Sequence, residues 1–73
     1  MDMTKLTVNG EAHEVSHGLG DGLTVAGLLG HLGLPTQKIA VERNLEIVPR
    51  SAYQKVTLRN GDRIEIVHFV GGG

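Results

Sequence analysis

The sequence contains no cysteine and no tryptophan, and its 73 residues include one tyrosine and one phenylalanine. The absence of cysteine excludes a disulfide framework, a thiolate metal site and a cysteine nucleophile. The shortage of aromatic side chains leaves almost nothing on which the bases of single-stranded nucleic acid could stack. A net charge of −1, from 7 basic and 8 acidic residues, argues against binding to phosphate backbones.

Long hydrophobic runs are also missing. No apolar stretch approaches the roughly 20 residues that a transmembrane helix needs, and residues 1–5 lack the basic-then-apolar pattern of a signal peptide. We therefore expect a cytoplasmic, soluble protein that is monomeric when free and binds neither membranes nor nucleic acid. A chain of this length buries only about 60% of its unfolded surface, which leaves little room for a water-excluding catalytic pocket.

Alternating polar and apolar residues predict a β-hairpin at the start of the chain. Residues 5–8 (Lys-Leu-Thr-Val) have the period of a half-buried strand, and residues 11–15 resume the strand. Asn9-Gly10, which separates the two segments, is the strongest short signal for a hairpin turn. We expect this hairpin to cover residues 3–17, approximately.

One amphipathic helix is predicted after a glycine-rich loop at residues 18–22. Thr24 is a suitable N-cap and Gly33 a suitable C-cap. Between them, an apolar stripe with the i, i+3, i+4, i+7 spacing of a helix face consists of Val25, Leu28, Leu29 and Leu32. This stripe would cover one face of a sheet.

Several short strands follow the helix. We expect strands at 38–42 and 46–48 around a turn at Arg43-Asn44, one helical turn at 50–53, a strand at 55–58 before a second Asn-Gly pair, and a long last strand at 63–70. Because a single helix can cover only one face of one sheet, these elements predict an α+β protein. We assign it to the β-grasp roll, a mixed sheet of four to five strands covered on one face by a single main helix, with the last strand beside the first. Residues 1–70 would form this domain and residues 71–73 a flexible C-terminal glycine tail.

Two candidate sites do not meet the requirements of their chemistry. His13 and His17 are four residues apart on a strand-to-loop segment, where that spacing does not bring side chains together as it does on a helix. In the glycine-rich loop at 18–22, the third glycine of a dinucleotide fingerprint would fall at Leu23, and the Lys-Ser/Thr pair of a phosphate loop is missing. We therefore expect no catalytic residue, no metal site and no cofactor bound by this chain.

The last strand and the tail form the most informative pattern. If Ile64 and Ile66 face the core, Val67 and Phe69 are apolar residues on the other face. Either the protein's own loops cover them or they form a docking patch for a partner. The glycines at 71–73 make the thinnest possible peptide and extend about 10 Å. A carrier whose reactive group is its own C-terminus accounts for these features together, and a frayed end or a cloning remnant is the alternative.

Three segments resemble the ThiS-type sulfur carriers of thiamine biosynthesis, which belong to the ubiquitin-like β-grasp family. They are Val-Glu-Arg-Asn at 41–44, Glu-Ile-Val-Pro-Arg at 46–50, and Gly-Asp-Arg-Ile-Glu-Ile-Val-His-Phe-Val-Gly-Gly-Gly at 61–73. The Gly-Asp turn and the terminal Gly-Gly are shared with other β-grasp sulfur carriers, including the small subunit of molybdopterin synthase. That relative typically has a proline before its Gly-Gly, whereas His-Phe-Val stands here, which favours the thiamine branch.

The resemblance implies a protein co-substrate rather than an enzyme. An E1-like adenylyltransferase would adenylate the Gly73 carboxylate with ATP and Mg²⁺, a persulfide sulfurtransferase would supply sulfur for a thiocarboxylate, and thiazole synthase would use that sulfur for the thiazole ring. Gly73 would be the reactive residue, Gly71 and Gly72 would thread it into the partner's active site, and our structural interpretation adds Val67 and Phe69 as docking residues. The alternatives are a sulfur carrier for molybdopterin synthesis, a ubiquitin-like protein modifier, and an interaction module with an incidental tail.

Overall fold

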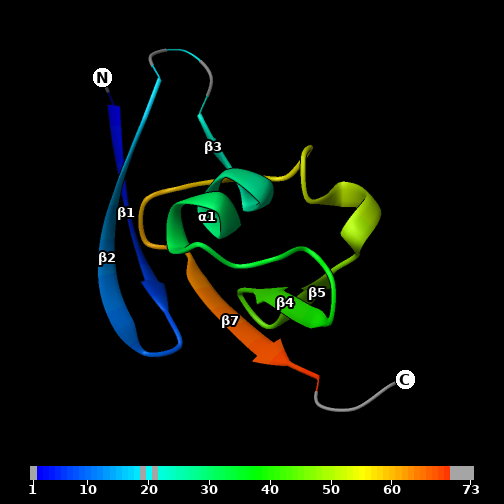
Figure 1. Cartoon of the computed structure of the whole chain (residues 1–73). Coiled ribbons are helices and arrows are strands. Elements are labelled where there is room, and N and C mark those ends of the chain that lie inside the picture. The colour runs from blue at the N-terminus through cyan, green and yellow to red at the C-terminus, as the bar shows by residue number, and fades with distance from the viewer. Residues whose placement is uncertain (1, 19, 21, 70–73) are drawn as a thin grey trace.

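The computed structural model describes residues 2–18, 20 and 22–69 and places nearly half of them in strands around one α-helix (Figure 1). The elements are β1 Asp2–Val8, β2 Glu11–His17, β3 Leu23–Thr24, α1 Val25–Leu32, β4 Ile39–Arg43, β5 Glu46–Val48, a 3₁₀ turn Arg50–Ala52, β6 Thr57–Leu58 and β7 Arg63–His68. Five strands form a mixed sheet in the order β2-β1-β7-β4-β5, and β3 pairs with β6. β7 runs parallel to β1 and antiparallel to β4. The prediction that the last strand lies beside the first is therefore confirmed.

The β1–β2 hairpin forms as its sequence predicts. Val8 pairs with Glu11, so the connection consists of Asn9 and Gly10 alone. Both residues have positive φ, 48° and 84°, which is what the two central positions of a type I′ turn require. The local sequence therefore determines the register of the first two strands.

Helix α1 begins and ends at the predicted caps. The Thr24 hydroxyl accepts a hydrogen bond of 3.0 Å from the Gly27 N–H, and Gly33 ends the helix in the left-handed conformation with φ 72°. Of the predicted stripe, three residues are fully buried and Leu32 is half-buried. Within the described ranges, neither α1 nor any other helix has the length and apolar character needed to cross a membrane.

We expect Thr24→Ala to lower the free energy of unfolding by about 1 kcal/mol, because it removes the acceptor of the Gly27 N–H at the start of α1. Urea unfolding measures this change. Thr24→Ser keeps an acceptor in the same place and serves as the matched control. If the alanine variant were as stable as the serine variant, Thr24 would not act as the N-cap.

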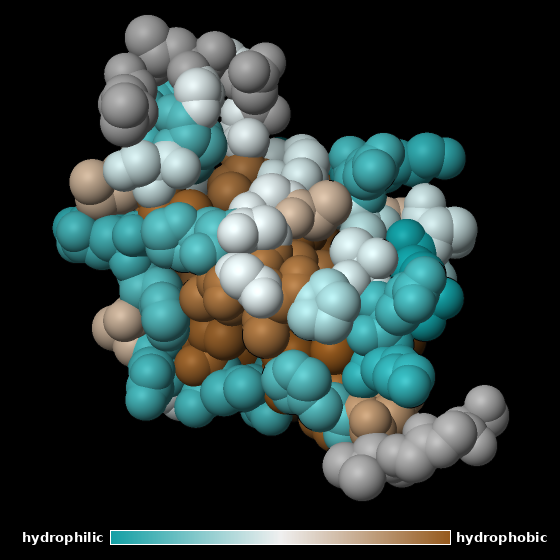
Figure 2. All heavy atoms as spheres, in the orientation of Figure 1, coloured by the Kyte–Doolittle hydropathy of each residue, from teal (hydrophilic) through white to brown (hydrophobic). Residues whose placement is uncertain are grey.

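The core lies between α1 and the inner face of the five-stranded sheet. Its most deeply buried side chains are Val15, Val25, Leu28, Leu29, Val41 and Ile64. The segment before β6 holds the first turn of the helix, since Val25 N–H donates to the Val56 carbonyl and Ala26 N–H to the Tyr53 carbonyl, and this satisfies amides that a helix start leaves without partners. In the same orientation, Figure 2 shows hydrophobic residues gathered around α1 and framed by hydrophilic ones.

The turn after β4 lies one residue later than predicted. Arg43 belongs to the strand, where it pairs with Glu46 of β5 and Ile64 of β7. The turn residues are Asn44 and Leu45, with φ values of 51° and 71°. Leucine is rare in this region of backbone space, so local preferences alone do not predict this turn.

Two predicted strands are shorter than expected. The strand predicted at 55–58 is reduced to Thr57–Leu58, and it pairs with β3 rather than with β7. The second Asn-Gly pair, Asn60-Gly61, therefore does not join hairpin partners; its polar groups bind the backbone of Lys5 instead. The last strand ends at His68 rather than at residue 70, and residue 70 lies outside the described residues.

Candidate functional site

Strand β7 leads the chain out of the core toward the glycine tail. Ile64 and Ile66 are buried, whereas Val67 and Phe69 are 54% and 56% exposed. The predicted alternation is therefore confirmed, and the described residues leave more than half of each side chain uncovered. Gly71, Gly72 and Gly73 lie outside the described residues, so their roles stay predictions.

Apolar residues continue across the sheet face that points away from α1, where Ile47, Val67 and Phe69 are exposed and Ala40 is half-buried. Ala40 is paired with Val67 in β7, and Ile47 in β5 is paired with a residue of β4 on the same face. The Phe69 N–H donates to the Lys38 carbonyl at 2.9 Å and so continues the β4–β7 ladder past the strand's end. We call the four residues Val67, Phe69, Ala40 and Ile47 the outer patch. Hydrophobic atoms also lie near the end of β7 in Figure 2.

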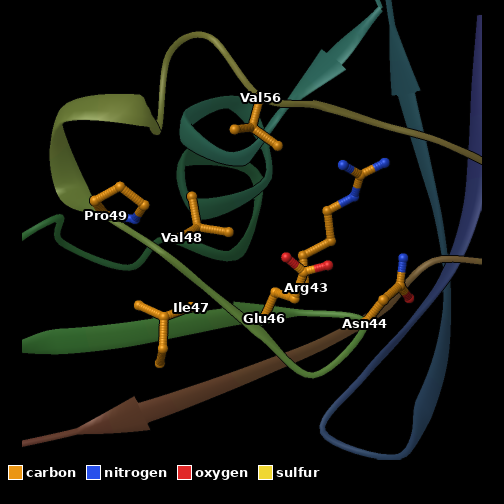
Figure 3. A pocket seen from close by; sticks show the side chains of 7 residues that line it. All are labelled: Arg43, Asn44, Glu46, Ile47, Val48, Pro49 and Val56. Atoms are coloured by element: carbon orange, nitrogen blue, oxygen red, sulfur yellow. The ribbon is translucent and has the colours of Figure 1, made fainter.

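Ile47 was not among the predicted docking residues. Its side chain is 66% exposed, and in Figure 3 it points away from Val48 and Val56, which lie on the α1 side of β5. In a strand, successive side chains point to opposite faces. A strand at residues 46–48 that buries Val48 therefore places Ile47 on the outer face. Three residues are too few for this alternation to be recognised from the sequence alone.

Asn9 supports β7 beyond the point where β1 ends. Its backbone N–H donates to the Ile64 carbonyl at 2.9 Å. Its side-chain amide donates to the Ile66 carbonyl at 3.2 Å and accepts from the Ile66 N–H at 2.7 Å. The amide thus takes the place of a strand backbone and extends the short parallel pairing of β1 with β7. The sequence places Asn9 only in the hairpin turn, and nothing local reveals a contact 57 positions away.

A buried carboxylate, Asp62, holds the turn just before β7. It accepts hydrogen bonds from Arg43 Nε at 2.9 Å, from Asn44 Nδ2 at 3.0 Å and from the Arg59 N–H at 2.8 Å. The Asn44 side-chain oxygen in turn accepts from the Arg63 N–H at 2.9 Å. The Val-Glu-Arg-Asn and Gly-Asp segments therefore meet in space, and together they fix the start of β7.

These contacts shift the acidity of Asp62. Burial alone would raise its pKa, but the hydrogen bonds from Arg59, Asn44 and Arg43 and the charge of Arg43 lower the pKa below its ordinary value of 3.8. A carboxyl group whose pKa is lower in the folded than in the unfolded state stabilises the fold. This stabilisation is fully present at pH values above the pKa of the unfolded state. That contribution is lost as the pH falls toward the pKa of the folded state.

We expect Asp62→Asn to lower the free energy of unfolding by about 1–3 kcal/mol near neutral pH, because it leaves donors without a charged acceptor. The variant should also lose less stability than the parent when the pH falls below about 4, since Asp62 no longer takes up a proton on unfolding. Urea unfolding across this pH range measures both effects, with Glu11→Gln on exposed β2 as the control. If the free energy of unfolding fell equally steeply with pH in the parent and the variant, Asp62 would not have a lowered pKa in the folded state.

A cavity of about 210 Å³ lies beside the Asp62 network, between β5 and the segment that leads to β6 (Figure 3). Its apolar lining residues are Ile47, Val48, Pro49 and Val56, and its polar ones are Arg43, Asn44 and Glu46. No pairing of a nucleophile with a base is present in this lining. In the described ranges, no three His, Asp or Glu side chains are grouped to hold a metal ion.

The family of the chain is identified by comparison with known proteins. The family model described as "ThiS family" matches residues 6–73. The chain belongs to the ThiS family. The sulfur carrier protein ThiS of Bacillus subtilis is 48% identical over 50 residues, which are 68% of this chain and 76% of that protein. The resemblance to ThiS-type sulfur carriers that the three sequence segments indicate is therefore confirmed.

Solved structures of ThiS proteins share the fold. The crystal structure of the thiamine biosynthesis protein ThiS from Geobacter metallireducens matches with a TM-score of 0.73 and 34% identity, over 96% of this chain and 100% of that one. A designed protein based on human ubiquitin matches with a TM-score of 0.52 at 17% identity, over 100% and 98% of the chains, and shows likeness of fold alone. The predicted β-grasp fold is confirmed, and in the described residues it consists of a mixed five-stranded sheet and a single α-helix.

Two longer relatives carry the name thiazole synthase. The protein from Paramagnetospirillum magneticum is 52% identical over 69 residues, and that from Magnetococcus marinus is 46% identical over 69 residues. Both matches cover 94% of this ThiS-family chain but only 20% of the relative. The chain thus spans about a fifth of the length of these relatives, in which a ThiS-like segment is part of a longer polypeptide.

Proposed function

We propose that this chain carries sulfur, as a thiocarboxylate on Gly73, for the formation of the thiazole ring of thiamine. The observation that carries the proposal is the ThiS family match, which extends through residue 73 and so includes the glycine tail. The names of the relatives agree with it, since one is a sulfur carrier and two are thiazole synthases. The proposal requires Gly73 to have a free carboxylate, which the intact mass of the cellular protein measures.

The chemistry explains why such a carrier needs a partner at each step. A carboxylate is a poor electrophile, so an E1-like adenylyltransferase would first use ATP and Mg²⁺ to form an acyl adenylate at Gly73, with AMP as a good leaving group. The terminal sulfur of a persulfide sulfurtransferase would then displace AMP to give an acyl disulfide, and a thiol would cleave its S–S bond, leaving the thiocarboxylate on Gly73 and a disulfide on the sulfurtransferase. The resulting thiocarboxylate is a soft nucleophile, suited to attack on a carbonyl-type or imine-type carbon in thiazole synthase. ATP and metal belong to the activating partner in this scheme.

The contribution of the chain itself is to present its tail from a fixed position. Asn9 and Asp62 hold β7 from both ends of its core-facing segment, and the last described hydrogen bond joins the Phe69 N–H to Lys38. Four residues follow this anchor, and when extended they span at most about 14 Å. This length is suited to reach a buried active site while the folded domain stays outside.

We also propose that Val67 and Phe69 contact thiazole synthase. Replacing both with serine should weaken binding of the carrier by about tenfold or more, because exposed apolar side chains at the centre of an interface contribute most of its affinity. Calorimetric titration with purified thiazole synthase measures the loss. Met3→Ser, which removes another half-exposed apolar side chain at the start of β1, is the control. Equal affinity of the double variant and the parent would exclude the two residues from the docking surface.

Transfer of labelled sulfur tests the proposed function. The chain is loaded with ³⁴S at its C-terminus and given to thiazole synthase with its other substrates. Recovery of ³⁴S in the thiazole product is the expected result. Transfer only to the large subunit of molybdopterin synthase would assign the chain to the other pathway. A ladder of Gly73-linked conjugates in cells, with no thiazole label, would make it a protein modifier.

A further inference from the structure

Two glutamates face each other on the outer face of the sheet. Glu42 of β4 is paired directly with Glu65 of β7 in the antiparallel register. Their sequence neighbours Val41, Ile64 and Ile66 are buried, so both carboxylates project from the face opposite α1. Side chains directly opposite in an antiparallel pair have Cβ atoms about 5 Å apart, and like charges placed there destabilise the sheet.

No nearby arginine among the described residues forms an ion pair with Glu42 or Glu65. Arg43 follows Glu42 in the chain but lies on the inner side, where its Nε is bound to Asp62 at 2.9 Å. Arg63 shares the outer face with Glu65. In the part of the chain that the structure describes, the ion pairs within 4.0 Å include neither Glu42 nor Glu65. In the described residues, the two facing carboxylates therefore have no cation within 4.0 Å, and Arg63 lies on their face two residues before Glu65.

Apolar side chains of the outer patch flank the two carboxylates on two sides. Ile47 is the cross-strand partner of Glu42 on its other side, and Val67 follows Glu65 by two residues on the same face. A cation from another molecule would lie close to both carboxylates while apolar contacts around it exclude water. Exclusion of water strengthens the attraction between opposite charges. Complementary charges also determine which partner binds and in which register.

We infer that the outer face of this sheet binds a protein surface that presents an arginine or lysine side chain in an apolar surround, with the cation seated between Glu42 and Glu65. Ile47 and Val67 make the apolar contacts on either side. This inference rests on the proposed function, which supplies thiazole synthase as the partner to test. A face-to-face second copy of the chain would bring two acidic pairs together, so charge complementarity favours a basic partner.

The double variant Glu42→Gln/Glu65→Gln tests the inference through two measurements with opposite expected directions. Its melting temperature should rise, because two repelling charges are removed. Its affinity for purified thiazole synthase should fall by about tenfold at low salt, and the remaining affinity should depend less on salt than that of the parent. The matched control Glu11→Gln/Glu14→Gln on β2 removes the same charge and should change the affinity by less than about twofold.

Several results would overturn the inference. An affinity equal to that of the parent would remove the acidic pair from the interface, and a lower melting temperature would show that the pair is stabilised within the chain. Self-association of the parent that the double variant loses would make a second copy the occupant. If the parent chain itself failed to bind thiazole synthase, the proposed function would fail together with the inference. A failure confined to the variant comparison would leave the proposed function standing.

Discussion

Deletion of Gly73 is expected to abolish sulfur loading while the domain stays folded. The new terminal carboxylate would lie one residue, about 3.5 Å, short of the position that the activating enzyme's site requires, and misplacement of a reacting atom by even about 1 Å can cost about a hundredfold in rate. The core residues of the described fold lie between Leu6 and Ile66. The melting temperature should therefore remain nearly unchanged. Mass spectrometry after incubation with the activating enzyme, ATP and a sulfur donor measures the loading.

Gly30→Ala is a suitable control for this deletion. A Cβ atom at Gly30 meets nothing within 4 Å, and the substitution lies on α1, away from the end of β7. It should leave loading at the level of the parent. Replacement of Gly72 by tryptophan keeps the length of the tail but adds bulk, and it should also abolish loading. Normal loading of the chain without Gly73 would contradict the account, and a large fall in its melting temperature would show that the tail packs on the domain.

Leu28→Ala should have the opposite effect, with a loss of about 2–5 kcal/mol in the free energy of unfolding. Leu28 is 0% exposed and lies at the centre of the helix face that packs on the sheet. The total free energy of unfolding of a small domain is about 5–15 kcal/mol, so a loss of this size is a large part of it. Urea unfolding measures the loss, and sulfur loading per folded molecule should be unchanged.

Leu45→Ala is the matched control for the core variant. Leu45 is 77% exposed in the turn after β4, so the same substitution should change the free energy of unfolding by less than about 0.5 kcal/mol. Equal losses at the two positions would mean that α1 does not pack through Leu28.

The elements that the sequence predicts well are those held by local interactions. The hairpin depends on Asn9 and Gly10, which adopt the positive φ values that their turn needs. The helix depends on its apolar stripe and on the caps Thr24 and Gly33, which bind within the same few residues. These features follow from short segments whose physics does not require the rest of the chain.

The features that the sequence does not predict are held by distant contacts. The turn at Asn44-Leu45 is displaced by one residue, because Asp62, 18 and 19 positions further on, binds Asn44 and Arg43. Thr57–Leu58 pairs with β3 rather than with β7, so its partner is decided by the path of the chain around α1. In each case the deciding partner lies far away in the sequence, where local patterns carry no information.

The candidate site divides in the same way. Exposure of Val67 and Phe69 follows from strand alternation after Ile64 and Ile66, and the structure confirms it. The facing of Glu42 and Glu65 requires the order of strands and the register between β4 and β7, and neither can be obtained from one strand alone. The role of the tail remains a prediction, because it depends on the chemistry of its last residue rather than on packing.

The most direct test of the central claim is the intact mass of the chain after incubation with an E1-like adenylyltransferase, MgATP, a persulfide sulfurtransferase and a thiol reductant. Our account predicts a mass gain equal to the difference between one sulfur and one oxygen atom. It also predicts that fragmentation locates the gain in the peptide that ends at Gly73, and that omission of ATP prevents it. The absence of any gain, or a gain that persists after removal of Gly73, would contradict the claim that this residue carries the sulfur.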